Sequence, residues 1–396
     1  MTTLSARPGF RRTACSITLG IAAGLGLAAS LPVWAQDLST IKVPPRFTRP
    51  AADTDEGGLW GMMDREEARM KRSPLTIKDK ELQAYLHGVI CKLSDGHCPD
   101  MRVLAVRTPH FNAMMAPNGM MLVWSGLLLR VENEAQLAAV LGHEMGHYLE
   151  RHTVEQLRAA KDTAVVSTMV GMIGGVGTFL GQIGLAANLF AFSREHESRA
   201  DRMGMRLMRF AGYDGQQAPV VWGNLLDEMK VTGGKEAGKT GDIFDTHPVT
   251  AARREELLQL AGAPGGDVGE ERYRNAIAPL RFGWIQDEVK RGQFEESLVL
   301  FNRMLKKDPQ DVEVLYARGE VYRLRDDGGD AERALADLEH ASALAKAPPE
   351  TFRALGLLQK QRQQPAAAAE AFRTYLARAP QAADAELVRS YLAELQ

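Results

Sequence analysis

The sequence predicts an α+β domain, mostly helical with a small β-sheet, followed by an all-helical domain built from repeats. Three observations support this organisation. The chain has 396 residues, which exceeds the size of one typical hydrophobic core. Residues 101–124 contain short alternating apolar stretches that favour strands, whereas the segments around them have helical periodicity. From residue 281 onward the chain is almost wholly helical, and one unit recurs along it.

Residues 1–35 have the features of a secretory signal peptide. Three arginines form a positively charged n-region, residues 17–31 form an apolar h-region, and a small-residue cleavage site follows. The h-region is short and rich in glycine and alanine, so a retained membrane anchor is the weaker interpretation. We expect export and cleavage near Ala35-Gln36, followed by an extended leader over residues 36–58 that is rich in proline, threonine and charge.

The charge balance excludes one class of partner. Lysine and arginine number 48 and aspartate and glutamate number 50, which gives a formal net charge of −2. Binding to nucleic acid relies on a strongly basic surface that faces the phosphates. We therefore expect no nucleic-acid partner.

Two cysteines would remain after export, Cys91 and Cys98, and they bracket a short loop. An oxidising compartment favours a disulfide between cysteines so placed. The neighbouring His97 suggests a metal site as an alternative, but no further ligand pair lies nearby in the sequence. We expect a structural disulfide.

The first elements of the predicted domain are two helices, one strand and one β-hairpin. Helical periodicity and period-two alternation distinguish these elements. Asn118-Gly119 is a strong signal for a tight hairpin turn. The expected helices cover residues 59–72 and 78–93, the expected strand covers 101–106, and the hairpin strands cover 112–115 and 120–124.

The central motif lies in a predicted helix from residue 133 to 151, where His143, Glu144 and His147 spell H-E-x-x-H. Histidines four residues apart leave the same face of a helix, so both imidazoles can bind one divalent metal. The carboxylate of Glu144 can take a proton from a water held by that metal. Two glycines lower the propensity of this helix, which indicates a close approach by a metal site or by another backbone.

A second segment, fifty residues further along, offers a third ligand. Glu197 and Asp201 are again four residues apart in a predicted helix and share a face. Zinc in hydrolases commonly has three protein ligands and a fourth position for water. Glu197 can supply the third ligand, and Asp201 can hydrogen-bond the far nitrogen of a ligand imidazole. The alternative is an ordinary charged helix, because arginines surround both residues.

Two further histidines lie beside these motifs. His152 follows His147 by five residues, about 140° further round a continuous helix, and we expect it to be solvated or to pair with the helix dipole. His196 adjoins Glu197 but would point about 100° away from it. Both are expected to lie outside the site.

Two motifs resemble those of the M48 family of zinc metallopeptidases: H-E-M-G-H at residues 143–147 and E-S-R-A-D-R at residues 197–202. The resemblance extends to the expected hairpin region at residues 111–128 and to T-H-P-V-T-A-A-R at residues 246–253. It implies a zincin-like metallopeptidase domain over residues 59–265. It also implies one zinc ion, although the ligand types alone fit non-haem iron as well. The zinc ligands that it implies are His143, His147 and Glu197.

The resemblance also implies roles for other residues. Glu144 would be the general base. His247 would either block the open zinc position as a latch or hydrogen-bond the tetrahedral intermediate, and a loop-to-helix cap is the alternative. Arg253 would stabilise the oxyanion or bind substrate carbonyls. The edge strand at Asn112-Ala113 would pair with the substrate backbone through main-chain hydrogen bonds.

The tail, residues 281–396, has the pattern of tetratricopeptide repeats. Phe301 and Phe372 are 71 residues apart, close to two repeats of 34, and Pro309 and Pro380 follow at the same spacing. Such a repeat places small residues where its paired helices cross and an aromatic residue on the second helix. Stacked repeats form a concave surface for extended partners. A plain helical bundle is the alternative.

The segment between the two metal motifs, residues 163–192, is apolar, uncharged and rich in glycine. It is long enough to span a bilayer. A span there would separate His147 from Glu197, which conflicts with a shared metal. We expect an apolar hairpin or helical pair that covers the cleft and can contact a membrane surface or an apolar client. A buried helical pair of the core is an equal alternative.

Together these features predict a zinc-dependent endopeptidase. With its repeats, the chain resembles periplasmic members of the family. This resemblance implies a periplasmic enzyme that degrades misfolded or stalled outer-membrane β-barrel proteins and assists their assembly, with the outer-membrane assembly machinery bound by the repeats. One alternative is a chaperone or scaffold whose zinc site is latent and whose repeats bind clients. Another is a membrane-embedded protease anchored by residues 163–192.

Overall fold

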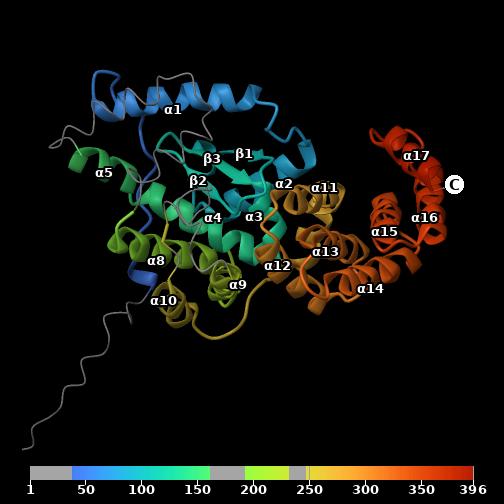
Figure 1. Cartoon of the computed structure of the whole chain (residues 1–396). Helices are drawn as coiled ribbons and strands as arrows, with labels where there is room; N and C mark the ends of the chain where they lie inside the picture. The colour runs from blue at the N-terminus through green and yellow to red at the C-terminus, as the bar shows by residue number, and fades with distance from the viewer. Residues whose placement is uncertain (1–37, 161–191, 232–246, 249, 396) are drawn as a thin grey trace, which may run out of the picture.

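The structure, a computed structural model, describes residues 38–160, 192–231, 247–248 and 250–395 (Figure 1). It confirms the predicted fold class, because helices surround one small sheet and an all-helical region follows. The predicted signal peptide and all but the last residue of the apolar segment 163–192 lie outside the described residues. Among the helices that are described, none has the length and apolar character needed to cross a bilayer.

The N-terminal part starts with a short 3-10 helix, Leu38–Thr40, and then has no regular structure until α1 (Asp55–Arg72). This helix begins earlier than predicted because Thr54 caps it. The Thr54 hydroxyl oxygen accepts a hydrogen bond of 3.0 Å from the backbone N–H of Gly57, and the first turn is acidic. A helical turn therefore replaces the end of the predicted leader, residues 36–58.

Three strands form the sheet in the order β1-β3-β2, with β1 at Arg102–Val106, β2 at Ala113–Met115 and β3 at Met120–Trp124. The hairpin prediction is confirmed, because β2 runs antiparallel to β3 with Ala113 opposite Val123. β1 pairs with the other side of β3 in a parallel register. The β2 strand therefore lies at one edge of the sheet.

The two faces of β3 are both buried, which explains its continuous apolar sequence. Met120 and Leu122 point to one face and pack with Met63 and Met70 of α1. Met121, between them, points to the other face and joins the main core. Figure 1 shows α1 on one side of the sheet and α4 (Glu134–Leu149) on the other.

The central helix of this part of the molecule is α4, and every one of its residues is buried. Asn133 caps it by accepting a hydrogen bond of 2.8 Å from the backbone N–H of Gln136. The helices around the sheet are α2 (Lys80–Leu93), α3 (Ser125–Arg130), α4 (Glu134–Leu149), α5 (His152–Ala160), α8 (Arg194–Phe210), α9 (Gln217–Val231) and α10 (Ala251–Ala261), with a 3-10 helix at Cys98–Asp100.

The C-terminal region is a curved array of helices that extends away from the sheet (Figure 1). Neighbouring helices pair, and a Cβ added at Gly356 of α15 would lie 2.4 Å from the ring of Phe372 in α16. A small residue is thus required where these helices cross, which is consistent with a tetratricopeptide-like array. The helices are α11 (Glu270–Arg291), α12 (Phe294–Lys307), α13 (Val312–Arg325), α14 (Asp330–Ala343), α15 (Pro349–Gln361), α16 (Pro365–Arg378) and α17 (Ala385–Glu394).

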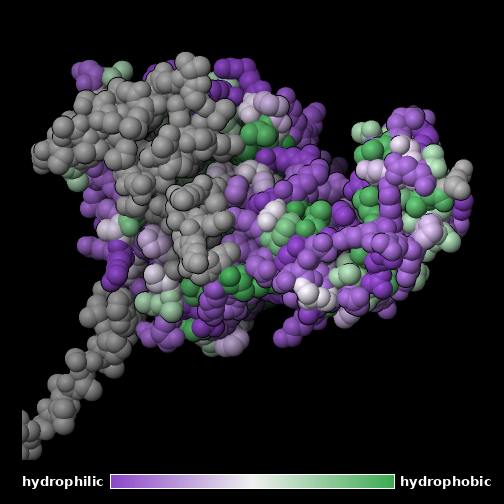
Figure 2. Space-filling model, in the orientation of Figure 1, coloured by the Kyte–Doolittle hydropathy of each residue, from purple (hydrophilic) through white to green (hydrophobic). Residues whose placement is uncertain are grey.

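A buried group of charges joins this array to the sheet-containing part. Arg130 of α3 donates hydrogen bonds to Glu228 of α9 at 2.7 Å and to Glu288 of α11 at 2.9 Å. Arg291 donates a further one to Glu288 at 2.8 Å. We call Arg130, Glu228, Glu288 and Arg291 the junction cluster. Figure 2 shows one face of the molecule, on which the surface of the helical array is mainly hydrophilic with scattered hydrophobic residues.

Candidate metal centre

The site is built where α4 and α8 cross with their backbones almost in contact. A Cβ added at Gly146 would lie 2.7 Å from the carbonyl oxygen of Ala200, and one added at Gly204 would lie 2.8 Å from the backbone nitrogen of His143. No side chain fits at either position. The glycines that weaken α4 as a helix therefore allow the close approach of another backbone. This crossing brings the two motif segments together.

Four ligand groups converge at this crossing. His143, His147, Glu197 and His247 are all buried, and one potential ligand atom of each lies within 4.8 Å of the others. The Nε2 atoms of His143 and His147 are 3.1 Å apart. Glu197 places its carboxylate oxygens 3.5 Å and 3.4 Å from these two nitrogens. The structure thus brings together the three ligands predicted from the sequence.

His247 is the fourth member of this group. Its Nδ1 lies 2.9 Å from Glu197 Oε1 and 3.3 Å from His143 Nε2. Its Nε2 lies 3.6 Å from Glu144 Oε1. Burial alone would lower the pKa of His247, but Glu197 and Glu144 outweigh this effect and raise it. The imidazole of His247 therefore lies next to the three predicted ligands.

The donors and the charges fit a divalent metal. Imidazole nitrogens and a carboxylate are the donor types that bind zinc. Among the described residues, the three buried carboxylates of Glu144, Glu197 and Asp201 outnumber the buried guanidinium of Arg253 at this site. In the same part of the chain, the buried Oε1 of Glu144 has no hydrogen-bond partner. A divalent cation would offset the excess of carboxylates, and a water that it holds would provide a partner for Glu144.

Asp201 and Arg253 support the ligands from behind. Asp201 Oδ1 lies 2.8 Å from Nδ1 of His143, the imidazole nitrogen on the side away from the other ligands. Arg253 donates two hydrogen bonds to Asp201, at 2.8 and 2.9 Å, and pairs with Glu197 at 2.5 Å. These contacts hold both carboxylates in place. The proposed contact of Arg253 with substrate stays a prediction.

The expectation for His152 is wrong. Its side chain is fully buried, and its Nδ1 lies 2.9 Å from Nδ1 of His147. His196 is also part of this region, because its ring stacks on that of His152 at 4.5 Å. The prediction assumed one continuous helix, whereas the chain breaks at Arg151, whose φ is +59°. Burial lowers the pKa of His152 to about 3.

Phe192 is a site residue that the sequence did not single out. Its ring lies 3.9 Å from the ring of His147 and 5.1 Å from that of His247, measured between centroids. An aromatic ring in this position excludes water from one side of the imidazoles. The available signals were its place two residues before α8, which carries the second motif, and its place at the end of the apolar segment 163–192, which was expected to cover the cleft.

Glu144 lies in an environment suited to proton transfer. Burial raises the pKa of its carboxyl group, although His247 and His143 partly oppose this rise. A general base works best when its pKa is moved toward the pH at which the enzyme operates. The arrangement can therefore accept a proton at Glu144 beside a metal and return it later.

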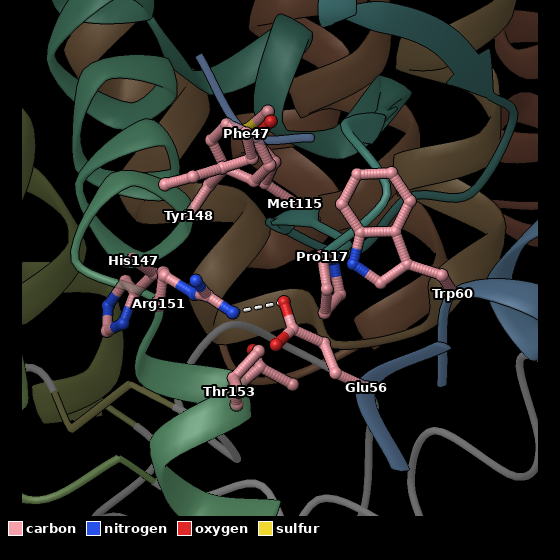
Figure 3. Close-up of a pocket in the computed structure, with 10 residues that line it drawn as sticks. Phe47, Glu56, Trp60, Met115, Pro117, His147, Tyr148, Arg151 and Thr153 are labelled. Carbon is pink, nitrogen blue, oxygen red and sulfur yellow. Dashed lines mark hydrogen bonds and ion pairs between the residues drawn. The ribbon is translucent and has the colours of Figure 1, made fainter. Parts of the chain in front are cut away.

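The edge strand β2 packs against α4, the helix that carries His143 and His147. Ala113 is its first residue and Asn112 comes directly before it, and both of these predicted substrate-binding residues are buried. Its last residue, Met115, lines a small pocket beside His147 (Figure 3). In this pocket His147 and Trp60 lie on opposite sides.

The predicted disulfide is present between Cys91 at the end of α2 and Cys98. It lies outside the metal centre. Within the loop that it closes, Nε2 of His97 lies 2.8 Å from the carbonyl oxygen of Pro44. The loop therefore fixes the segment that precedes α1.

The comparisons with known proteins agree with this geometry. Residues 76–261 match the sequence model described as "Peptidase family M48". This range contains the sheet and every residue of the metal centre. Residues 76–261 are thus similar to the M48 peptidase family. Within this matched range, the structure places a buried group of His143, His147, Glu197 and His247 that is able to bind a metal.

Three relatives illustrate the extent of the similarity. The mitochondrial metalloendopeptidase OMA1 of Arabidopsis thaliana is 33% identical over 163 residues, which are 40% of this chain and 31% of the relative. The β-barrel assembly-enhancing protease of Escherichia coli (strain K12) is 24% identical over 260 residues, which are 62% of this chain and 52% of the relative. The metalloprotease YcaL of the same strain is 27% identical over 155 residues, 38% of this chain and 58% of the relative. The chain therefore matches between about a third and three fifths of these proteins.

Proposed function

We propose that this chain is a zinc-dependent endopeptidase. The observation that carries the proposal is the convergence of four ligand groups within 4.8 Å, beside Oε1 of Glu144, which has no hydrogen-bond partner in the described part of the molecule. The metalloprotease names of its relatives support the same activity. Zinc is preferred to iron because the M48 resemblance carries it, while the neighbouring carboxylate favours hydrolysis.

In this proposal His143, His147 and Glu197 would hold the metal. A bound zinc ion supplies Lewis acidity and lowers the pKa of a water ligand toward about 7. Glu144 would accept a proton from water at its carboxylate and would afterwards donate it to the leaving amine. Arg253 and Asp201 keep the ligand side chains oriented throughout, because their contacts do not depend on the substrate.

Substrate would bind along β2. Among the described residues this strand pairs with β3 alone, so its outer edge is the natural place for an extended peptide to add through main-chain hydrogen bonds. Asn112 and Ala113 would contribute these bonds. Such binding makes little demand on side chains, and an enzyme of this kind needs another source of selectivity.

We further propose that selectivity comes from residues 281–396 acting as tetratricopeptide repeats. The name of the β-barrel assembly-enhancing protease suggests outer-membrane β-barrel proteins as clients and their assembly machinery as a partner. A signal peptide at residues 1–35, an M48-like domain at residues 59–265 and a periplasmic location complete the proposal. Contact between residues 163–192 and a membrane surface is part of it.

The decisive experiment compares zinc content and casein digestion in the parent and in Glu144→Gln. The variant keeps every proposed ligand but cannot accept a proton, so we expect unchanged zinc content and a loss of activity by a factor of about 100 to 10,000. Full digestion by Glu144→Gln would overturn the proposal. A parent protein without zinc would overturn it as well.

A second function, a chaperone with a latent zinc site, is favoured by the position of His247. Its Nδ1 is within 3.3 Å of His143 and Glu197, where it takes space next to the ligands. The variant His247→Ala distinguishes a latch at the zinc site from a residue that stabilises the intermediate. If His247 is a latch, the variant digests casein faster than the parent, and if His247 stabilises the intermediate, it digests casein more slowly.

A further inference from the structure

We propose that His152 is a positioning residue for the metal centre: it accepts a hydrogen bond from Nδ1 of His147 and thereby holds Nε2 of that imidazole toward the metal. The inference rests on the proposed function, because it assumes that His147 is a zinc ligand. The two Nδ1 atoms are 2.9 Å apart, and the His152 side chain is fully buried.

The direction of this hydrogen bond follows from the chemistry of imidazole. A neutral imidazole carries one proton, and the nitrogen that binds a metal must be free of it. In His147 the nitrogen that faces the other ligands is Nε2, 3.1 Å from His143 Nε2 and 3.4 Å from Glu197. The proton of His147 is then on Nδ1. His152 can only be the acceptor, through its own Nδ1.

This arrangement repeats, for the second ligand, what Asp201 does for the first. Asp201 Oδ1 lies 2.8 Å from Nδ1 of His143. Each of the two ligand imidazoles therefore has a buried acceptor behind it. Such outer partners fix the tautomer and the ring orientation of a ligand. An acidic acceptor serves one histidine, and a neutral acceptor serves the other.

The backbone is shaped to bring His152 back to His147. In a continuous helix the two side chains would be about 140° apart. Instead α4 ends at Leu149, Arg151 adopts a left-handed conformation with φ of +59°, and α5 starts at His152. Residues with side chains rarely adopt this conformation. Interactions of the Arg151 side chain hold it there, namely an ion pair with Glu56 and a position 5.3 Å from the ring centre of Phe47.

The ring of His152 is also held from its other side. His196, in the first turn of α8, stacks on it with ring centres 4.5 Å apart and an angle of 27° between the planes. Nε2 of His196 lies 3.6 Å from Glu155 of α5. Contacts from α8 therefore pack against the ring of His152, while the backbone break at Arg151 sets where its Nδ1 lies.

The test uses two variants of the full chain that differ in one property. His152→Asn keeps an acceptor, because the side-chain oxygen of asparagine takes nearly the position of Nδ1, whereas His152→Leu fills the space without an acceptor. Zinc affinity is measured by competition with a chelator, and the cobalt-substituted proteins are compared by visible absorption. We expect His152→Leu to lose about 10- to 100-fold in zinc affinity and to change the cobalt spectrum. We expect His152→Asn to stay within a few-fold of the parent and to keep its spectrum.

His196→Leu is the control for packing, because it removes the stacked ring and leaves the hydrogen bond. It should bind zinc nearly as tightly as the parent. Equal zinc affinity in the parent and His152→Leu would overturn the inference alone. So would equal losses in His152→Leu and His152→Asn, or a loss in His196→Leu as large as that in His152→Leu. A parent that binds no zinc would overturn the proposed function together with the inference.

Discussion

The metal centre and the junction cluster are both groups of buried charges, but only one of them is balanced. In the junction cluster, two arginines face two glutamates, and Glu288 accepts hydrogen bonds from Arg130, Arg291 and Ser297. In the metal centre, three carboxylates share one arginine, and imidazole nitrogens approach one another within 3.1 Å. A buried group with equal numbers of positive and negative side chains can be a structural element by itself. A buried group with an excess of carboxylates requires a cation from outside the chain.

The comparison predicts that the two regions respond differently to chelation, and this is the largest expected effect. A ligand present at about 1,000 times its Kd stabilises a folded protein by about 4 kcal/mol. Removal of zinc should therefore lower the melting temperature, as measured by calorimetry, and addition of zinc should restore it. Hydrogen exchange should increase in α4 and α8 but not in α11. A melting temperature that is the same with and without chelator would contradict this prediction.

The junction cluster should instead be sensitive to the loss of one of its own members. Glu288→Gln removes the carboxylate that Arg130 and Arg291 share, while Arg130 keeps its pair with Glu228 and Arg291 keeps its pair with Glu296. Removal of one partner from a buried ion pair costs about 3 kcal/mol or more. Urea unfolding should show this loss while zinc content stays at the parent value. A loss below about 1 kcal/mol would show that the cluster tolerates the loss of the shared carboxylate.

The pH dependence of the same variant sharpens the comparison. Burial alone would raise the pKa of Glu288, but Arg130 outweighs it, so the pKa lies below its ordinary value of 4.5. A carboxyl group with a lowered pKa stabilises the fold above the unfolded value, and this contribution is lost as the pH falls through the folded value. The difference in stability between the parent and Glu288→Gln should thus be constant above pH 4.5 and should shrink below it. A stability difference between the two proteins that grows as the pH falls would contradict this prediction.

The smallest effect is expected for a matched change on the surface. Glu370 of α16 pairs with Arg373 three residues later, but its side chain is 76% exposed. Exposed ion pairs contribute about 0 to 1 kcal/mol. Glu370→Gln removes the same charge as Glu288→Gln, and urea unfolding should show a change of at most about 0.5 kcal/mol. A larger change would mean that burial does not explain why Glu288 and Glu370 contribute differently to the free energy of unfolding.

The parts of the molecule that could be predicted from the sequence are those encoded by short spacings. His143 and His147 share one helix face, and Glu197 and Asp201 share another, so local geometry was sufficient to select them. The hairpin followed from one Asn-Gly pair in the same way. The glycines of α4 indicated a close approach by a metal site or by another backbone, and the crossing with α8 shows that it is another backbone.

The features that could not be predicted depend on distant pairs or on a single backbone angle. Arg130 is 98 residues from Glu228 and 158 from Glu288, so no spacing connects them. His152 was placed wrongly because one residue, Arg151, leaves the helical region. The sequence signal for Arg253 did not reveal that it holds Asp201 and Glu197, because its partners come from another helix.

The contact between α4 and α8 has a consequence for how this family of sites can vary. The backbones of α4 and α8 are in contact at Gly146 and Gly204, so the distance between the two helices that carry the metal-binding residues is set by the main chain. A change of side-chain rotamer cannot alter this distance. Neighbouring apolar side chains can be exchanged without altering it. One methyl group at either glycine would instead force the two helices apart and move His143 and His147 away from Glu197.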